Sequence, residues 1–278
     1  MGDYAGASEV LRTANASKAQ RTAWSNASWQ KFVQGQLAGS ALPQVDAPAD
    51  FVPVFVIGLP RTGTTLVTSL LAKDPRLRDR GELNWIDGMY QLLAEQGRLH
   101  DVRAISRVSE IVSAQMRQDD APASWYLDKN PLNFRHLNLI AAIFPKAKII
   151  HCRRDRRDTA LSLWMQHFAH SDLNFSYEFS RIAAFESGYQ SLIRHWRNTL
   201  PLDFLDVDYE SLVTDTLRSV DRVHEFLGML SPEMPVEYAP SSAITTASVW
   251  QVRQPVYTSS IGRWKNYEAH LPQLRRLF

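Results

Sequence analysis

From about residue 51 onward, short hydrophobic runs alternate with longer amphipathic stretches. Four runs are continuous and rich in β-branched or aromatic residues, as in strands buried on both faces, at residues 51–57, 125–128, 148–152 and 204–208. The stretches between them have helical spacing, at residues 64–72, 83–95, 102–116, 134–144, 158–168, 177–200 and 219–227. This alternation predicts an α/β fold with a parallel β-sheet flanked by helices on both faces. A site is then expected at the carboxyl ends of the strands.

The first part of the chain has a different character. Residues 1–40 are rich in Ala, Ser, Gln and Asn and are predicted to be helical, whereas Pro43 and Pro48 break any helix in a linker at residues 41–50. We therefore predict a helical segment at 1–48 and a main domain at 49–278. The opening residues Gly2–Arg12 resemble the end of a tetratricopeptide repeat, although no second copy follows. A helix that packs on the main domain is the alternative interpretation.

Charge and cysteine content narrow the classes of partner. Thirty-one Lys and Arg residues against 29 Asp and Glu residues give a net charge of +2, so no bulk charge favours nucleic acid or a membrane surface. The single cysteine, Cys152, excludes an internal disulfide framework and fits a reducing compartment. No apolar run has the length of a membrane span. We expect a soluble, cytoplasmic protein that binds no nucleic acid, and a homo-oligomer is compatible with the sequence.

The first predicted strand leads into a glycine loop, Gly58–Thr65, and then into a helix. Such a loop offers backbone N–H groups and the positive end of a helix to an anion. Its two glycines and final threonine fit the Walker A pattern, but Thr64 stands in place of the lysine that contacts nucleoside triphosphates. Arg61 instead supplies a permanent charge within the loop. The sequence thus predicts an anion site that needs no metal ion.

A second basic motif follows the third predicted strand and contains Arg153, Arg154, Arg156 and Arg157. A cluster of this kind is also typical of a solvated face or a nucleic-acid patch. Its position at the end of a strand favours a second phosphate site. Ser162 lies eight residues after Arg154, within the next predicted helix, where its hydroxyl is able to share a phosphate with that arginine.

Together, the motifs Phe55–Thr65 and Cys152–Ser162 resemble those of the sulfotransferase family, which uses 3′-phosphoadenosine 5′-phosphosulfate (PAPS) as donor. The similarity extends from about Val54 to about Leu271. It is closest to the branch with the tyrosylprotein sulfotransferases and the bacterial tetratricopeptide-repeat sulfotransferases. It implies a P-loop NTPase-like sulfotransferase fold, and transfer of a sulfuryl group to the hydroxyl of a peptide tyrosine, sugar, lipid or small phenol. The nucleotide product is 3′-phosphoadenosine 5′-phosphate (PAP).

The resemblance also assigns catalytic roles. Glu82, in the pair Gly81-Glu82, matches the family's catalytic base, which removes the proton of the acceptor hydroxyl. Lys129 matches the lysine that neutralises charge on the bridging oxygen, and Arg61 is expected to stabilise the sulfuryl oxygens or the 5′-phosphate. In the cytosolic small-molecule branch a histidine is the base, so His136 or His167 is the alternative if Glu82 does not act.

Several further residues match donor contacts of the family. The loop residues are expected to hold the 5′-phosphosulfate, and the others to contact the 3′-phosphate or the nucleotide: Arg61, Thr62, Gly63, Thr64, Thr65, Arg154, Ser162, Tyr209, Ser248 and Arg263. Tyr209 is equally consistent with a core aromatic residue. Gly262 and Arg263 stand where the tyrosylprotein branch has Ser and Lys, which weakens any inference of the same acceptor.

Two other functions are compatible with parts of the pattern. A nucleotide kinase or NTPase of related fold would require Mg²⁺-dependent turnover of ATP, and the missing loop lysine argues against it. A catalytically inactive module would bind nucleotide or RNA through the arginine cluster with a steep salt dependence. The near-neutral net charge and the presence of both Glu82 and Lys129 argue against that function.

Overall fold

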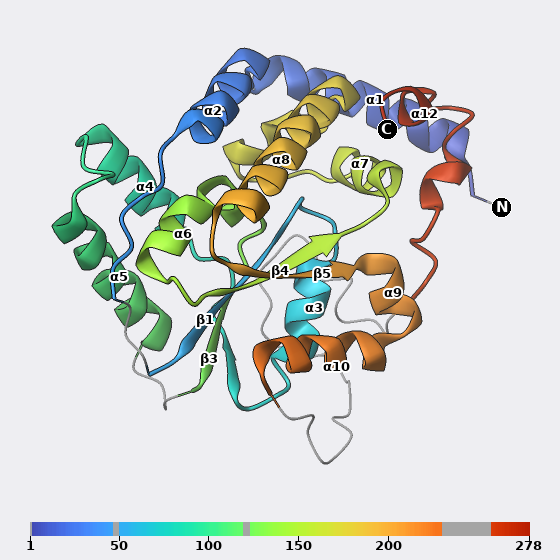
Figure 1. Ribbon diagram of the computed structural model, residues 1–278. Coiled ribbons are helices and arrows are strands. Elements are labelled where there is room, and N and C mark those ends of the chain that lie inside the picture. The colour runs from blue at the N-terminus through green and yellow to red at the C-terminus, as the bar shows by residue number, and fades with distance from the viewer. Residues whose placement is uncertain (1, 47–49, 119–122, 230–256) are drawn as a thin grey trace.

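A computed structural model describes residues 2–46, 50–118, 123–229 and 257–278. Within these residues the centre of the molecule is a five-stranded, all-parallel sheet (Figure 1). Its spatial order is β2-β3-β1-β4-β5. The strands are β1 (Val52–Gly58), β2 (Leu77–Asp79), β3 (Trp125–Asp128), β4 (Lys148–Arg153) and β5 (Asp203–Asp208). The chain places β2 and β3 on one side of β1 and then crosses to β4 and β5 on the other side. Because the strand order reverses at β1, the carboxyl end of this strand is the position where α/β proteins form a binding crevice.

Helices precede, connect and follow the strands. The α-helices are α1 (Tyr4–Arg21), α2 (Asn26–Ala38), α3 (Thr64–Leu71), α4 (Trp85–Glu95), α5 (Val102–Arg117), α6 (Leu137–Ile143), α7 (Arg156–Trp164), α8 (Phe179–Thr199), α9 (Tyr209–Thr214), α10 (Thr216–Leu227) and α12 (Gln273–Arg276). Three 3₁₀ helices are also described, η1 (Pro131–His136), η2 (Ser171–Tyr177) and η3 (Arg263–Asn266).

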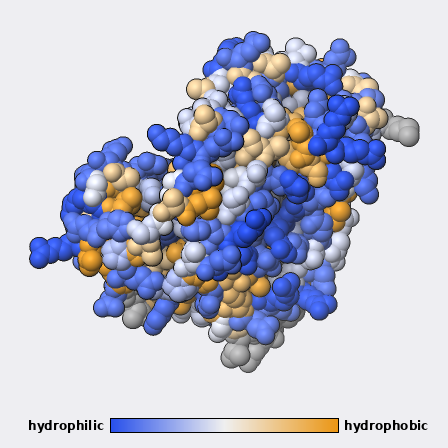
Figure 2. All heavy atoms as spheres, turned by 45° about the horizontal axis from the view of Figure 1, so that its top comes forward, coloured by the Kyte–Doolittle hydropathy of each residue, from blue (hydrophilic) through white to orange (hydrophobic). Residues whose placement is uncertain are grey.

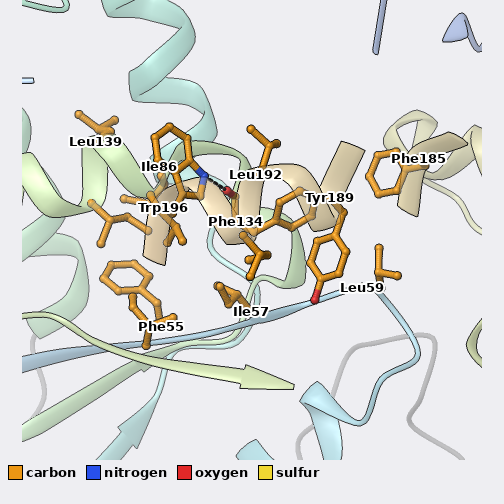
Figure 3. Packing of buried hydrophobic residues seen from close by; sticks show 14 of the residues in the cluster. Phe55, Ile57, Leu59, Ile86, Phe134, Leu139, Phe185, Tyr189, Leu192 and Trp196 are labelled. Carbon is orange, nitrogen blue, oxygen red and sulfur yellow. Dashed lines mark hydrogen bonds between the residues drawn. The ribbon is translucent and has the colours of Figure 1, made fainter. Parts of the chain in front are cut away.

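The sheet separates two hydrophobic layers. Phe55 and Ile57 of β1 face one layer, which includes Phe134, Tyr189 and Trp196 (Figure 3). The Trp196 ring N–H donates to the Phe134 carbonyl at 2.9 Å, so its polar atom is satisfied inside this layer. The alternate β1 residues Val54 and Val56 face the other layer, with side chains of α3 and α10. Helices thus cover both faces, as the sequence predicted.

Most of the predicted elements are confirmed, and the differences have local causes. The strand Leu77–Asp79 was not predicted, because it has only three residues and two of them are charged. The predicted helix at 158–168 begins earlier, at Arg156, because the Asp155 side chain accepts from the Arg157 and Asp158 N–H groups and caps it. The predicted helix at 134–144 is divided into η1 and α6.

The N-terminal helices lie against the helices that cover one face of the sheet (Figure 1). Trp29 of α2 stacks on Phe185 of α8, with ring centroids 4.4 Å apart. The Asn15 amide of α1 donates to the Trp164 carbonyl of α7 at 2.7 Å. The predicted helices of this segment are therefore present and packed on the main body. The division into residues 1–48 and 49–278 stays a prediction.

The face shown in Figure 2 is mostly hydrophilic, with hydrophobic residues in small separate groups, as is ordinary for a protein surface. Among the described helices, none is both long enough and apolar enough to cross a bilayer.

Candidate functional site

The register of the sheet gathers the predicted motifs at one edge. Gly58 at the end of β1 pairs with Cys152 of β4, so the glycine loop and the arginine cluster emerge side by side. Gly81-Glu82 and Lys129 follow the carboxyl ends of β2 and β3, and Tyr209 follows that of β5. Because all five strands are parallel, these groups meet at the same edge.

Two glycines shape the loop between β1 and α3. Gly58 has φ of 153°, and a Cβ atom there would lie 2.5 Å from the Cys152 carbonyl oxygen. Gly63 has φ of 95°, and its Cβ would lie 2.7 Å from the Tyr209 ring. Gly63 is also the N-cap of α3 and has no side chain to cap the first turn. The positive end of α3 therefore borders a cavity lined by Gly63, Thr64 and Thr65.

Arg61 occupies a strained position inside this loop. Its φ is 77°, a left-handed conformation that non-glycine residues rarely adopt and that is concentrated at functional sites. Its Nε donates to the Ser162 hydroxyl oxygen at 3.1 Å. Burial, and then the charge of neighbouring Arg154, lowers its pKa to about 10, so the guanidinium stays charged at neutral pH.

Arg154 lines the same cavity and is a direct neighbour of Arg61. It donates to the Arg61 carbonyl at 3.1 Å and to the Ser260 carbonyl at 2.7 Å, and its guanidinium lies 4.5 Å from the Tyr209 ring centroid. Its Nε is buried and finds no partner among the described residues. A buried donor without a partner, in a cavity with a second guanidinium, fits an anionic ligand. Arg154 and Ser162 both line this cavity, as their predicted shared role requires.

The other three arginines of the cluster are paired with acidic residues. Arg153 pairs with Asp206 and Asp208. Arg156 pairs with Glu186, and Arg157 with Asp155. The cluster is therefore not one continuous cationic surface, and Arg154 is the member that lines the cavity.

The C-terminal segment closes this cavity, and here sequence reasoning was incomplete. Tyr257, Ser259, Ser260 and Arg263 all line it, and the Tyr209 hydroxyl lies 2.5 Å from the Ser260 hydroxyl. Arg263 was predicted, whereas Tyr257, Ser259, Ser260 and the buried Asp158 were not. The first three lie within the stretch that resembles the family, which extends to about Leu271, but no pattern distinguished them from their neighbours. Tyr209 is both buried and part of the cavity wall. Ser248 lies outside the described residues.

A second cavity, of about 1030 Å³, adjoins the first. Arg61, Thr64 and Thr65 line both. Glu82 and Lys129 lie on the wall of the second, where the Lys129 ammonium forms an ion pair with the Glu82 carboxylate. Lys129 is buried, with 3 % of its side chain exposed, whereas Glu82 is 43 % exposed and accessible from the cavity.

Thr62, which was predicted to contact the donor, lies in the wall of neither cavity. Its hydroxyl donates to the Leu59 carbonyl at 2.7 Å and so stabilises the loop.

The two alternative histidines differ in position. His136 is buried, lies 2.9 Å from an Asp87 oxygen and stacks on Tyr90, and burial lowers its pKa. It does not line the second cavity, whereas His167 does. Of these two residues, His167 is therefore the one that reaches the second cavity.

The carboxyl end of β3 also carries a buried acid. Asp128 accepts from the Asn133 amide at 2.8 Å and from the Leu83 N–H at 3.3 Å. Burial raises the pKa of Asp128 to about 7. Its contact with Leu83 fixes the backbone next to Glu82.

Several known proteins are similar to this chain. It is 27% identical over 236 residues to an uncharacterized protein of Aquifex aeolicus, a match covering 79% of this chain and 31% of that protein. It is 26% identical over 202 residues to protein-tyrosine sulfotransferase 1 of Danio rerio, covering 66% of this chain and 50% of that protein. The chain thus spans between about a third and a half of these relatives.

Solved structures show the same fold. The sulfotransferase domain of the Synechococcus PCC 7002 olefin synthase superposes with a TM-score of 0.56 at 21% identity, covering 80% of this chain and 91% of that domain. The sulfotransferase domain from the curacin biosynthetic pathway gives 0.53 at 15% identity, covering 85% and 99%. Residues 53–233 match the model of the sulfotransferase family. Because that match covers more than half of the chain, the chain belongs to the sulfotransferase family.

Proposed function

We propose that this chain transfers a sulfuryl group from PAPS to a hydroxyl group of an acceptor. The observation that carries the proposal is the position of Arg61, which lines both cavities. On one side are the cations and hydroxyls of an anion site, and on the other is the Glu82–Lys129 pair. A group transferred between the two cavities passes beside a charged, partly desolvated guanidinium.

The first cavity has the chemistry that the donor requires. The N-terminal end of α3 and the loop residues Arg61, Gly63, Thr64 and Thr65 would hold the 5′-phosphosulfate through N–H groups, hydroxyls and the Arg61 charge. Arg154, Ser162 and Arg263 would hold the 3′-phosphate, with Ser248 as a further proposed contact. The buried, unpartnered Arg154 Nε supports this assignment.

The second cavity has the chemistry that the acceptor requires. When bound, the donor supplies the sulfuryl group and a phosphate leaving group. Glu82 would take the proton of the acceptor hydroxyl while that oxygen forms its bond to sulfur, and the electron pair of the breaking S–O bond stays on the phosphate oxygen. Protonation removes the charge that Glu82 shares with Lys129, so the Lys129 ammonium becomes available to the leaving oxygen. The acceptor class, whether peptide tyrosine, sugar, lipid or small phenol, is left open.

A comparison of ligands tests the donor assignment. A ligand at about 100 times its Kd adds roughly 2.7 kcal/mol of stability, which corresponds to a rise in Tm of roughly 5–10 °C for a chain of this size. We expect PAP to give this rise, AMP a smaller one, and ATP with Mg²⁺ no more than AMP. The Arg154→Ala variant should lose most of the PAP effect.

The matched control is Arg153→Ala, which removes a neighbouring arginine that is paired with Asp206 and Asp208. It should keep the PAP effect. Stabilisation by ATP with Mg²⁺ alone would instead support a kinase or NTPase. If PAP stabilised Arg154→Ala as much as the wild-type chain, the 3′-phosphate assignment would be wrong.

A further inference from the structure

We propose that Asp158 is a positioning residue of the donor site, which holds the segment 257–264 so that Ser260 and Arg263 line the cavity. The inference rests on the proposed function, because the ligand that it concerns is the donor nucleotide. Asp158 lies within the motif Cys152–Ser162, but the sequence pattern gave it no role. Its role follows from its contacts.

Both carboxylate oxygens of Asp158 are occupied by the same segment. Oδ2 accepts from the Gly262 N–H at 2.6 Å, and Oδ1 accepts from the Trp264 N–H at 2.8 Å. The residue lies in the first turn of α7 and is only 1 % exposed. Charge-assisted hydrogen bonds to backbone N–H groups are stronger than neutral ones, and burial protects them from competing water. Asp158 therefore anchors the backbone on both sides of Arg263.

The conformation of Gly262 makes this arrangement possible. Its φ is 67°, in the left-handed region that glycine adopts without strain, and it is the N-cap residue of η3. The turn directs its N–H to Asp158 and places the next residue, Arg263, at the cavity wall. This accounts for glycine at a position where the tyrosylprotein branch has serine.

The anchored segment is connected to the donor residues themselves. Arg154 donates to the Ser260 carbonyl at 2.7 Å, and the Tyr209 hydroxyl contacts the Ser260 hydroxyl. The Arg157 guanidinium also stacks 3.9 Å from the Trp264 ring centroid. Loss of the Asp158 anchor would therefore loosen Arg263 and Ser260 while Arg154 stays on its own strand end.

A direct role for Asp158 as a ligand is chemically unfavourable. The neighbouring groups are arranged for an anion, and a carboxylate would repel a phosphate at close range. Its oxygens are instead satisfied by N–H groups of the anchored segment. The geometry thus assigns it to positioning rather than to binding.

The test compares PAP with AMP, which lacks the 3′-phosphate, in titrations of Asp158→Asn, Arg263→Ala and the double variant. Asn keeps one acceptor oxygen and loses the other, so we expect PAP to bind about tenfold more weakly, the change that one charge-assisted hydrogen bond gives, and AMP binding to change little. Because Asp158 acts through Arg263, the Arg263→Ala change should have little further effect in the Asp158→Asn background.

Two controls separate positioning from general destabilisation. Asp74 is another buried aspartate, accepts from the Arg76 N–H and lines neither cavity. Asp74→Asn should lower the Tm and leave the ratio of PAP to AMP affinity unchanged. Gly262→Ala strains the same turn while keeping the carboxylate, so it should lower that ratio even if Asp158→Asn folds poorly.

The outcomes are distinguishable. Suppose that the wild-type chain prefers PAP to AMP. If both variants, Asp158→Asn and Gly262→Ala, keep this full preference, the role proposed for Asp158 is wrong and the proposed function stands. Additive effects of Asp158→Asn and Arg263→Ala would also overturn it. A wild-type chain that does not distinguish PAP from AMP would overturn the proposed function and this inference with it.

Discussion

At the scale of single residues, the proposed chemistry depends on Glu82, the half-exposed partner of the buried Lys129. Glu82→Gln keeps the shape of the side chain but cannot accept a proton, so turnover should fall by about 10²–10⁴-fold. PAP should still raise the Tm, because Glu82 does not line the donor cavity. Initial rates and the ligand-induced Tm shift of one preparation check both statements.

His167→Gln is the matched control, because His167 lines the same cavity and is the alternative base. We expect turnover close to that of the wild-type chain. A loss in this variant, with normal turnover in Glu82→Gln, would transfer the role of the base to the histidine.

Asp128 predicts a dependence of stability on pH. Burial raises its pKa to about 7 from 3.8, so the folded chain binds this proton more tightly than the unfolded chain. The resulting stabilisation is complete below the unfolded value and is lost as pH rises through about 7. Asp128→Asn is neutral at every pH. The wild-type free energy of unfolding should therefore decrease relative to this variant between about pH 4 and about pH 7.

Urea unfolding of both chains at about pH 5 and about pH 8 measures this difference. Comparing the two chains cancels the contribution of buried histidines such as His136 and His151, which titrate in both. Parallel pH profiles would show that Asp128 is ionised throughout.

At the scale of elements, the loop between β1 and α3 requires glycine at position 63, whereas helix α2 does not require the glycine at position 35. Gly63→Ala would place a Cβ atom 2.7 Å from the Tyr209 ring at φ of 95°. It should destabilise the fold by roughly 1–3 kcal/mol and remove the PAP effect on Tm.

Gly35, inside α2, has nothing within 4 Å of its Cβ position. Gly35→Ala should stabilise the chain by roughly 0.5–1 kcal/mol. Thermal unfolding with and without PAP tests both; equal effects of the two substitutions would contradict the assignment.

At the scale of the whole molecule, the contact between α2 and α8 holds the N-terminal helices against the main body. Trp29 is 8 % exposed and its ring N–H donates to the Ala184 carbonyl at 3.2 Å, an approach that Gly188 permits. Trp29→Ala should destabilise by roughly 3–5 kcal/mol while unfolding remains a single transition by circular dichroism.

The control for this change is Val10→Ala on the exposed side of α1, where Val10 is 70 % exposed. A surface substitution of this kind should alter stability by no more than about 0.5 kcal/mol. Two separate transitions in Trp29→Ala would show that the N-terminal helices fold independently of the main body.

The sequence alone determined the α/β class and the motifs of the site. The β-branched run of β1 and its glycine loop are local features, because burial pattern and turn chemistry are encoded within a few residues. The basic motif at the end of β4, the pair Gly81-Glu82 and the residue Lys129 are local features in the same sense. Each of these motifs follows the carboxyl end of a strand, and the parallel order of the sheet is sufficient to bring them together.

Only the tertiary structure decided which of these residues act together. The four arginines at the end of β4 are equivalent in sequence, yet their partners differ. Arg153 and Arg156 pair with acids of β5 and α8, Arg157 pairs with the nearby Asp155, and Arg154 lines the cavity. The anchor between Asp158 and Gly262 joins residues 104 positions apart. The ion pair between Glu82 and Lys129 spans 47 positions. Such pairings depend on how strands and helices are packed in three dimensions, and a pattern of neighbouring residues does not contain that information.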